Sequence, residues 1–241
     1  MPKGGAVVAV VLAAGRSRRM GEADKLLMRL GDRPLLAHCL GVLASSPLID
    51  AVQVVASRSN ISAVEDIARD SALGKLAGVC LGGEARSQSV LRGLEAVESM
   101  RCEWALVHDG ARPFLTEEIV RRGLEAAYTA GAAIAALSAS DTVKICDGDL
   151  RIESTPPRDR VWLAQTPQIA PAALLLALHR RYEDRLAGFT DEASLLEAAG
   201  YPVVVFEGSR DNIKIATPRD LALAESMLRS LPVSEGEPGR T

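Results

Sequence analysis

Four cationic side chains gather in one short loop near the start of the chain. The loop follows an unbroken apolar run, Val7–Ala14, and opens at Ala14-Gly15. Its cations are Arg16, Arg18, Arg19 and Lys25. Backbone N–H groups and positive charges at the end of a buried strand suit a polyphosphate, and open α/β sheets bind ligands at this edge. The loop therefore indicates phosphate chemistry, although a turn with solvated arginines would have the same composition.

This loop matches neither of two common phosphate-binding motifs. GxxxxGK[ST] is absent, and Ser17 and Met20 fill the positions after Gly15 where GxGxxG requires glycine. The chain contains 5 lysines against 23 arginines, and two of the lysines, Lys25 and Lys214, lie inside polar motifs. In a chain that otherwise uses arginine, this indicates positions that require a compact point charge.

Further polar clusters follow other predicted strands. They are Gly82-Gly83 with Arg86 and Ser89, HDGARP at His108–Pro113, and DNIK at Asp211–Lys214. Each has a local explanation when taken alone: Asp109 and Arg112 could pair within a turn, and Lys214 could be solvated. Because the carboxyl ends of parallel strands meet at one edge of a sheet, we expect all of these side chains to lie together.

The elements that would position these clusters alternate between strand and helix. The predicted strands are Val7–Ala14, Ala51–Ala56, Leu76–Leu81, Trp104–Val107, Ala132–Leu137 and Val203–Phe206. The predicted helices are Leu35–Leu43, Ile61–Arg69, Ser87–Val97, one capped by Thr116, Ala172–Arg185, one capped by Thr190 that ends at Ala199, and Leu221–Leu228. This order predicts an α/β fold with a doubly wound, mostly parallel sheet.

Residues 138–162 depart from that alternation. Two short alternating segments, Thr142–Ile145 and Leu150–Ile152, flank Asp147-Gly148-Asp149, and Asp-Gly between such segments is a hairpin signal. An isolated two-stranded hairpin is only marginally stable in water. We therefore expect a projecting β-hairpin arm that packs on a second subunit. A flexible surface excursion is the alternative.

Composition excludes several classes of protein. The 241 residues carry a net charge of −3, which gives no overall attraction to nucleic acid or to anionic membranes. The sequence contains no apolar run long enough to span a bilayer and no signal-peptide pattern, so we expect a cytoplasmic protein. We predict one domain over residues 1–230 and a disordered tail over 231–241.

The four cysteines do not form a recognisable metal or disulfide pattern. Cys39, Cys80, Cys102 and Cys146 are widely spaced and form no CxxC motif. Three of them lie in apolar patterns, which predicts buried free thiols, and no metal ligands are assigned.

The polar clusters resemble, in order and in content, the family of 2-C-methyl-D-erythritol 4-phosphate cytidylyltransferases. The matching motifs are AAGRSRRM with a following lysine, GGEARSQSV, VHDGARP, SDTVK, TPPR, AQTPQ, TDEAS and EGSRDNIKI. The resemblance extends from Val7 to about Leu228. It implies a nucleotide-diphospho-sugar transferase-like, Rossmann-like fold and a homodimer whose arm reaches the partner's active site. The implied reaction transfers CMP from CTP to a polyol phosphate with Mg2+, releases pyrophosphate, and belongs to non-mevalonate isoprenoid synthesis.

The resemblance also assigns roles to residues of this sequence. The implied catalytic residues are Arg19, Lys25, Arg158 and Lys214. The implied nucleotide-binding residues are Ala13, Ala14, Gly15, Gly82, Gly83, Ser89 and Asp109. The implied substrate-binding residues are Asp109, Arg112, Thr142, Arg158 and Thr166.

The sequence departs from the family pattern at three positions. Ser17 and Asp24 stand where glycine and proline are usual, and Gly110 replaces a frequent alanine. Asp24 places an acid beside Lys25 and leaves the path of the loop open.

Other activities remain compatible with these motifs. Ribitol 5-phosphate cytidylyltransferase shares most of them, and a sugar 1-phosphate or molybdopterin nucleotidyltransferase shares the first loop. A non-catalytic CTP-binding protein is the alternative from a different class.

Overall fold

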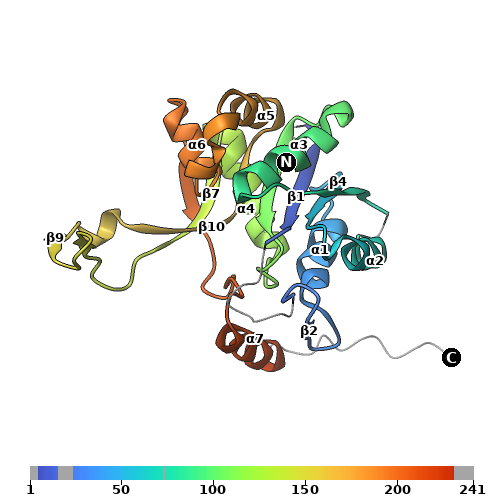
Figure 1. Ribbon diagram of the computed structural model, residues 1–241, viewed down its shortest axis with the longest axis horizontal. Coiled ribbons are helices and arrows are strands. Elements are labelled where there is room, and N and C mark those ends of the chain that lie inside the picture. The colour runs from blue at the N-terminus through green and yellow to red at the C-terminus, as the bar shows by residue number, and fades with distance from the viewer. Residues whose placement is uncertain (1–4, 16–23, 73, 231–241) are drawn as a thin grey trace.

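A seven-stranded sheet forms the centre of the computed structural model, which describes residues 5–15, 24–72 and 74–230 (Figure 1). The strand order is β11-β7-β10-β6-β1-β4-β5. The strands are β1 (Val7–Ala13), β4 (Ala51–Ala56), β5 (Leu76–Leu81), β6 (Trp104–Asp109), β7 (Ala133–Ser138), β10 (Trp162–Pro171) and β11 (Val204–Glu207). All neighbours pair in parallel except β10, which runs antiparallel to both β6 and β7. The predicted mostly parallel α/β fold is confirmed.

Helices cover both faces of this sheet. They are α1 (Leu35–Ser45), α2 (Ile61–Ser71), α3 (Arg86–Ala96), α4 (Glu117–Ala130), α5 (Ala172–Arg181) and α6 (Glu192–Ala198), whereas, as Figure 1 shows, α7 (Pro218–Ser230) lies beside β2 (Arg29–Leu30). One buried core contains side chains of α1, α2 and α4, and the other contains side chains of α3, α5 and α6. In β1, Val7, Ala9 and Val11 belong to the first core, whereas Val8 and Val10 belong to the second. A strand covered on both faces is therefore apolar at every position, which explains the unbroken run in the sequence.

The sequence prediction missed strand β10, and treated its residues as a connection into the next helix. Polar residues and Pro167 argue against a central strand, because proline cannot donate a ladder hydrogen bond. The structure accommodates Pro167 where the pairing with β7 changes register, between Ala164 and Gln168, and the Thr166–Pro167 peptide bond is cis. This interruption places Thr166 and Gln168 in the middle of the sheet.

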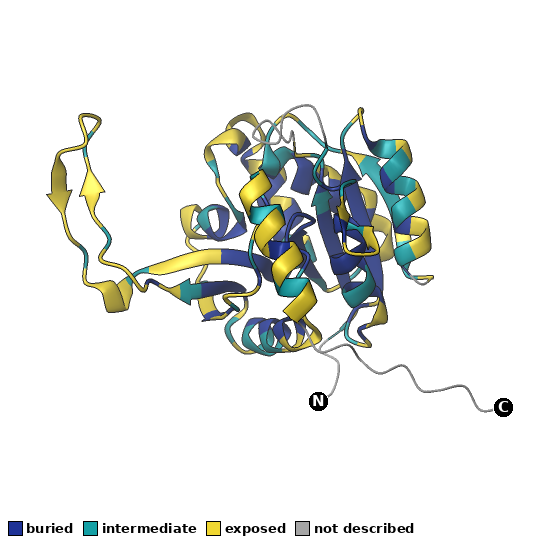
Figure 2. Ribbon diagram, turned by 90° about the horizontal axis from the view of Figure 1, so that it is seen from below, coloured by how far each residue is buried: buried dark blue, intermediate teal, exposed yellow. Residues whose placement is uncertain are grey.

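The predicted hairpin forms and projects from the body of the molecule (Figure 2). Strands β8 (Ile145–Cys146) and β9 (Ile152–Ser154) pair antiparallel. The turn is stabilised by Asp147, whose Oδ1 accepts hydrogen bonds from the backbone N–H groups of Asp149 and Arg151, both at 2.9 Å. Leu150 at its tip is 84% exposed and Ile152 is 62% exposed. This chain alone leaves the apolar side chains of the arm in water.

Several element boundaries differ from the predicted ones. The helix predicted to end at Arg185 ends at Arg181 and is followed by a 3₁₀ segment, η4 (Glu183–Gly188). The cap of α6 is Asp191 and not Thr190, because the Asp191 carboxylate accepts the backbone N–H of Ser194 at 2.9 Å. A short hairpin, β2 (Arg29–Leu30) and β3 (Arg33–Pro34), leads into α1 and contacts α7.

The cysteines are less buried than predicted. All four carry free thiols, but only Cys39 is fully buried, Cys80 and Cys102 are partly exposed, and Cys146 is exposed on the arm. Within the described residues, no helix is long and apolar enough to cross a membrane. The predicted tail, 231–241, and the loop cations Arg16, Arg18 and Arg19 lie outside the described residues.

Candidate active site

A cavity of about 470 Å³ lies where β1, β5 and β6 end. Its lining comes from the loop after β1, the segment around Lys25, the glycine segment after β5, the end of β6, and the segment that precedes α7. The lining residues that the sequence had singled out are Ala14, Gly15, Lys25, Gly83, Arg86, Ser89, Asp109 and Lys214. The strand-end clusters therefore meet at one edge of the sheet.

Asp109 lies at the centre of a group of cations in this cavity. Its Oδ2 is 2.8 Å from Lys214 Nζ, and its Oδ1 is 3.3 Å from Arg86 Nε. Arg112 Nε is 3.9 Å from Oδ2. Burial opposes ionisation of this carboxyl, but the charges of Arg86, Lys214 and Arg112 together hold its pKa well below the usual range. Asp109 is therefore an anion that fixes cations in place, rather than a general base.

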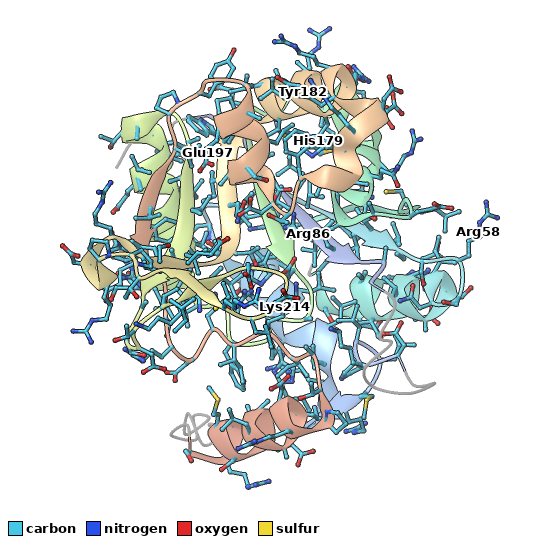
Figure 3. All side chains as sticks on the ribbon, turned by 60° about the vertical axis from the view of Figure 1, so that its left-hand side comes forward. Arg58, Arg86, His179, Tyr182, Glu197 and Lys214 are labelled. Carbon is cyan, nitrogen blue, oxygen red and sulfur yellow. The ribbon has the colours of Figure 1, made fainter. Side chains whose placement is uncertain are left out.

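The second carboxylate of this network is Glu192, at the start of α6. Arg86 Nη1 donates to Glu192 Oε1 at 2.9 Å, and Arg86 Nη2 donates to Glu192 Oε2 at 3.1 Å. Glu192 is only 2% exposed. This paired geometry holds the guanidinium rigidly and leaves its Nε to donate to Asp109 Oδ1. Figure 3 labels Arg86 and Lys214, the two cations that contact Asp109 most closely.

Behind Asp109, the motif residues form a buried layer. Thr166 Oγ1 accepts the backbone N–H of Asp109 at 3.1 Å and lies 3.1 Å from His108 Nδ1. His108 Nε2 faces the carbonyl oxygen of Arg112 at 3.2 Å. Burial lowers the pKa of His108 to about 4. The ring is therefore neutral at pH 7. Since a carbonyl only accepts, Nε2 carries the proton and Nδ1 accepts from the Thr166 hydroxyl. Thr166 is thus committed to positioning Asp109.

Asn212, from the DNIK motif, links this layer to Arg112. Asn212 Nδ2 donates to the carbonyl oxygen of Thr166 at 2.8 Å. The backbone carbonyl oxygen of Asn212 accepts a hydrogen bond from Arg112 Nη1 at 2.6 Å. Arg112 Nε is buried and has no hydrogen-bond partner in the described part of the chain. The oxygen that it faces is Asp109 Oδ2 at 3.9 Å, which is an ion-pair contact beyond hydrogen-bond distance.

The glycine segment after β5 is tightly packed. A Cβ on Gly82 would lie 2.6 Å from Ser89 Oγ and 2.7 Å from Ala14 Cβ, so no side chain fits there. Ser89 Oγ accepts the backbone N–H of Gly83 at 3.2 Å and donates to the carbonyl oxygen of Ala85 at 3.1 Å. A Cβ on Gly15, by contrast, would meet nothing within 4 Å. The two loops thus approach closely and leave open space in front of Gly15.

Two residues assigned to the substrate lie elsewhere. Thr142 and Arg158 belong to the arm, and neither is among the described residues that line the cavity. Arg158 is exposed, and its Nη1 donates to the carbonyl oxygen of Ser140 at 3.1 Å. Arg19 lies outside the described residues, and Ala13 and Gly82 are not among the described residues that line the cavity.

Sequence reasoning missed the Arg86–Glu192 pair. Arg86 was noted only beside a turn, and Glu192 only inside the TDEAS motif. The two residues are 106 positions apart in the chain. The available signal was an acidic residue in the first turn of a short helix whose other buried side chains are apolar.

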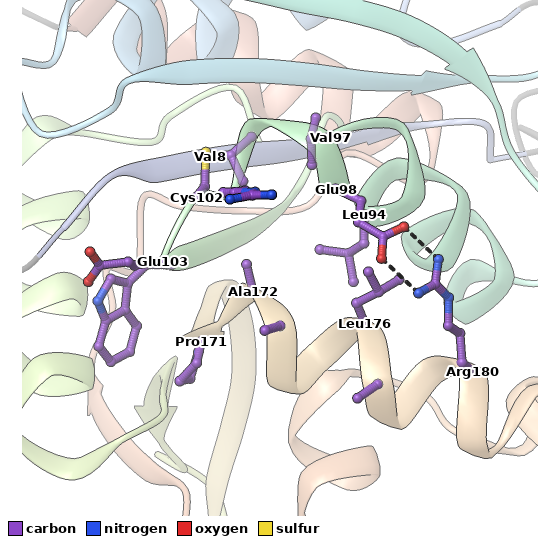
Figure 4. Close-up of a pocket in the computed structure, with 14 residues that line it drawn as sticks. Val8, Leu94, Val97, Glu98, Cys102, Glu103, Pro171, Ala172, Leu176 and Arg180 are labelled. Atoms are coloured by element: carbon purple, nitrogen blue, oxygen red, sulfur yellow. Dashed lines mark hydrogen bonds and ion pairs between the residues drawn. The ribbon is translucent and has the colours of Figure 1, made fainter.

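A second cavity, of about 630 Å³, lies between α3 and α5 (Figure 4). Leu94, Val97 and Leu176 contribute to its apolar walls, and Glu98 Oε2 pairs with Arg180 Nη2 at 2.7 Å. Among the described residues that line it, none belongs to the predicted catalytic, nucleotide or substrate sets.

Together, these features define a nucleotide-binding α/β protein with the charges that phosphoryl-group transfer requires. The cavity lies at the carboxyl edge of a mostly parallel, doubly wound sheet, and combines a tight glycine segment with lysine and arginine side chains. The particular family follows from comparison with known proteins.

The chain belongs to the family of 2-C-methyl-D-erythritol 4-phosphate cytidylyltransferases (IspD), whose model matches residues 7–230. A protein with this name from Dehalococcoides mccartyi (strain ATCC BAA-2266 / KCTC 15142 / 195) is 42% identical over 223 residues, covering 92% of this chain and 96% of the relative. One from Syntrophus aciditrophicus is 43% identical over 226 residues, covering 92% and 96%. The crystal structure of 4-diphosphocytidyl-2C-methyl-D-erythritol synthase from Anaerococcus prevotii DSM 20548 superposes with a TM-score of 0.83 at 30% identity, covering 93% of this chain and 96% of that one. The family resemblance found in the motifs is confirmed.

Proposed function

We propose that this protein transfers CMP from CTP to 2-C-methyl-D-erythritol 4-phosphate. The products are 4-diphosphocytidyl-2-C-methyl-D-erythritol and pyrophosphate, and the reaction serves non-mevalonate isoprenoid precursor synthesis. The observation that carries the proposal is the meeting of Lys25, Lys214 and the glycine segment at one cavity, in a chain that matches the family from residue 7 to 230.

The chemistry places its main demand on fixed positive charge. A phosphate oxygen of the acceptor attacks the α-phosphorus of CTP, a new P–O bond forms, and the bond to the departing pyrophosphate breaks. The nucleophile is already an anion at neutral pH, so no general base is needed. The difficulty lies in bringing two anions together and in stabilising charge on the α-phosphoryl oxygens. Lys25 and Lys214 are the described cations that we assign to this task, and we add Arg19 from the sequence.

Lys214 is prepared for this role by Asp109. The ammonium group is held 2.8 Å from the carboxylate, yet its side chain remains 45% exposed. A fixed, partly exposed cation can bind an incoming phosphate without reorganising. Because Arg86 also pairs with Asp109, the carboxylate does not fully neutralise Lys214, and the ammonium group can still attract a substrate phosphate.

The glycine segment is our proposed site for cytosine. The backbone N–H of Gly82 donates to the carbonyl oxygen of Ala56 at 2.8 Å, and the backbone N–H of Gly83 donates to Ser89 Oγ. Both donors are therefore used within the chain. Carbonyl oxygens on this segment remain as acceptors for the exocyclic amine of cytosine. With Ala13, Ala14 and Gly15 close by, the tight backbone favours a pyrimidine over a larger purine.

The acceptor is assigned to Arg112 and to the arm. The positive charge of Arg112, 3.9 Å from Asp109, supports a phosphate contact in this region. Thr142 and Arg158 stand away from their own chain's cavity, which supports a homodimer in which each arm completes the partner's site. The exposed apolar side chains at Ile145, Leu150 and Ile152 also favour a covered arm.

The proposed Mg2+ would arrive with the nucleotide. Both oxygens of Asp109 face cations, and no group of three His, Cys, Asp or Glu among the described residues could hold a metal ion. Magnesium commonly binds through substrate phosphates and water. It would supply charge neutralisation on the triphosphate. With both substrates water-soluble and a net chain charge of −3, we assign the reaction to the cytoplasm, with no nucleic acid or membrane partner.

Pyrophosphate release tests this proposal directly. The purified protein is given CTP and Mg2+ with methylerythritol 4-phosphate or ribitol 5-phosphate in parallel. Strong preference for the first supports the proposed function, and preference for the second would assign the protein to polyol phosphate activation. CTP binding without turnover on either acceptor would contradict catalysis and favour a binding protein.

A further inference from the structure

One buried amide side chain joins three segments beside the cavity. Asn60 immediately precedes α2 and is 3% exposed. Its Oδ1 accepts the backbone N–H of Ser57 at 2.8 Å. Its Nδ2 donates to the carbonyl oxygen of Ala13 at 3.0 Å and to Asp24 Oδ2 at 2.5 Å. Both protons of the amide nitrogen are therefore used, one at the end of β1 and one at the residue before Lys25.

Asp24 continues this connection into the turn that contains Lys25. Its Oδ1 accepts the backbone N–H of Leu26 at 3.0 Å, and its carbonyl oxygen accepts that of Leu27 at 3.1 Å. The carbonyl oxygen of Leu26 in turn accepts the backbone N–H of Leu36 at 3.1 Å. Lys25 thus lies between Asp24, which is hydrogen-bonded to Asn60, and Leu26, which is hydrogen-bonded to the first residues of α1.

The sequence alone left the effect of Asp24 open, because this acid stands next to a lysine assigned to catalysis. In the structure each of its carboxylate oxygens accepts a hydrogen bond, one from Asn60 and one from the backbone of Leu26. Hydrogen bonds to an ionised carboxylate are among the stronger ones in proteins. The acid therefore has a defined structural task in the turn.

We propose that Asn60 and Asp24 are positioning residues that set the place of Lys25 relative to the end of β1. The inference rests on the proposed function, in which Lys25 stabilises the transferring phosphoryl group. Neither residue lines the cavity, and the cavity wall at Ala14 begins directly after the carbonyl that Asn60 holds. Asn60 and Asp24 therefore form a clamp: their hydrogen bonds fix the distance between the backbone at Ala13 and the Lys25 side chain. Small displacements of a catalytic group cost rate rather than stability of the fold.

The test is a set of variants with kcat, the KM for CTP and Tm measured on each. Asp24→Ala removes both carboxylate acceptors, and Asn60→Ala removes the amide donor. Asp24→Asn keeps a single acceptor oxygen, which cannot accept from both Asn60 and the backbone of Leu26. We expect each to lower kcat by about 10-fold, with the KM for CTP changed less than about 3-fold, as for a misplaced transition-state contact. The double variant Asp24→Ala/Asn60→Ala should fall no further than the lower single variant, because the pair acts as a unit. Asp70→Ala, at an exposed position of α2, is the matched control and should change none of these values.

A Lys25→Ala background separates this inference from the proposed function. If Asp24 acts through Lys25, Asp24→Ala should have no further effect on kcat once Lys25 is removed. Normal kcat in the Asp24 variants, with Lys25→Ala impaired, would overturn the clamp and leave the proposed function standing. Near-normal turnover in Lys25→Ala itself would instead overturn the role given to Lys25. If Asn60→Ala fails to fold because Ser57 and Ala13 lose their partner, the two Asp24 variants alone decide the outcome.

Discussion

Lys214 and Asp109 form an ion pair at 2.8 Å that joins the last sheet-edge motif of the chain to the central one. Asp109 ends β6, whereas Lys214 precedes α7, so the pair closes the cavity across more than 100 positions of sequence. Its carboxylate also contacts Arg86, which is itself paired with Glu192. The site is therefore an alternating network of charges, in which each anion orients the cations beside it.

Removing the ammonium group of Lys214 should slow the reaction without unfolding the protein. The Lys214 side chain is half-exposed, so Lys214→Met creates no large buried cavity. Asp109 loses one cationic partner but remains paired with Arg86. We expect kcat to fall by about 10² to 10³, as for loss of one preorganised transition-state contact. Steady-state kinetics with CTP and the acceptor measure this. Lys75→Met, remote from the cavity, is the control, and equal rates in both variants would contradict the role of Lys214.

Glu192→Gln should destabilise the fold much more than loss of a surface acid. The substitution removes the charge from one of the two carboxylates that Arg86 contacts and leaves only Asp109, and breaking a buried pair typically costs 3–5 kcal/mol. Because Arg86 retains 25% side-chain exposure and glutamine keeps one acceptor, we expect about 3 kcal/mol, near the lower end of that range. Urea unfolding at pH 7 measures it. Glu118→Gln, which breaks an exposed pair with Arg121, should change the midpoint little; similar losses in both variants would show that the Arg86–Glu192 pair is not energetically special.

The fold could be predicted from the sequence where local pattern and tertiary environment agree. The apolar runs at β1 and β4 and the alternation of strands with helices identify the parallel strands, and Thr116 caps α4 as expected, accepting the backbone N–H of Ile119 at 3.3 Å. Strand β10 could not be predicted in this way. Its polar residues and proline are tolerated because they serve the site and the pairing is interrupted there.

The site could be predicted only as a set of loops. The positions of the glycine segment, Asp109 and Lys25 follow from parallel strands ending at a common edge. Which residues pair with each other depends on side-chain packing between distant segments, as for Arg86 with Glu192 or Asn60 with Asp24. The assignment of Thr166 to the substrate stays a prediction, and a motif alone does not show which groups a hydroxyl contacts. The structure has Thr166 bonded to His108 and to the backbone of Asp109.

Stability should fall as the pH is lowered from about 6.5 towards 4, and His108 should account for part of this fall. Its pKa is lowered to about 4 in the fold, from about 6.5 when unfolded. The unfolded chain therefore binds a proton in this window while the folded chain does not, which disfavours folding by up to about 1.4 kcal/mol per pH unit for one group. Burial also lowers the pKa of His38 and of His179, so they act in the same direction.

Urea unfolding of the His108→Gln variant at pH 7, 6 and 5 isolates that contribution. Glutamine presents an N–H donor near the position of Nε2 but does not titrate. The unfolding free energy of the variant should fall less steeply with falling pH than that of the parent. The difference between the two slopes should correspond to about one fewer proton taken up on unfolding. An unchanged slope would show that His108 is not a buried neutral group.

Gly82 and Gly15, one beside the cavity and one in its lining, should respond differently to a methyl group. Gly82→Ala would bring a Cβ to 2.6 Å from Ser89 Oγ and 2.7 Å from Ala14 Cβ, so we expect a lower Tm together with weaker CTP binding. Gly15→Ala meets nothing within 4 Å and should keep the Tm, yet its methyl group would occupy space that we assign to the nucleotide. Calorimetric CTP titration and thermal unfolding of both variants check this. Unimpaired CTP binding by Gly15→Ala would place the nucleotide elsewhere.

Activity should return when two differently inactivated subunits share a dimer. Thr142→Ala and Arg158→Ala damage the arm, which we propose completes the partner's site, whereas Arg19→Ala removes a cation to which the sequence assigns a catalytic role in its own chain. Each variant alone should be weakly active, and the arm variants should lose use of the polyol phosphate more than of CTP. In a mixed dimer one site combines an intact cavity with an intact arm, so up to about half of the heterodimer's sites regain function.

The measurement is pyrophosphate release after co-refolding, with subunit exchange verified by mass-tagged chains. Two variants of the same arm, mixed in the same way, are the control and should show no recovery. Exchange without recovery in the complementary mixture would mean that each arm serves its own chain.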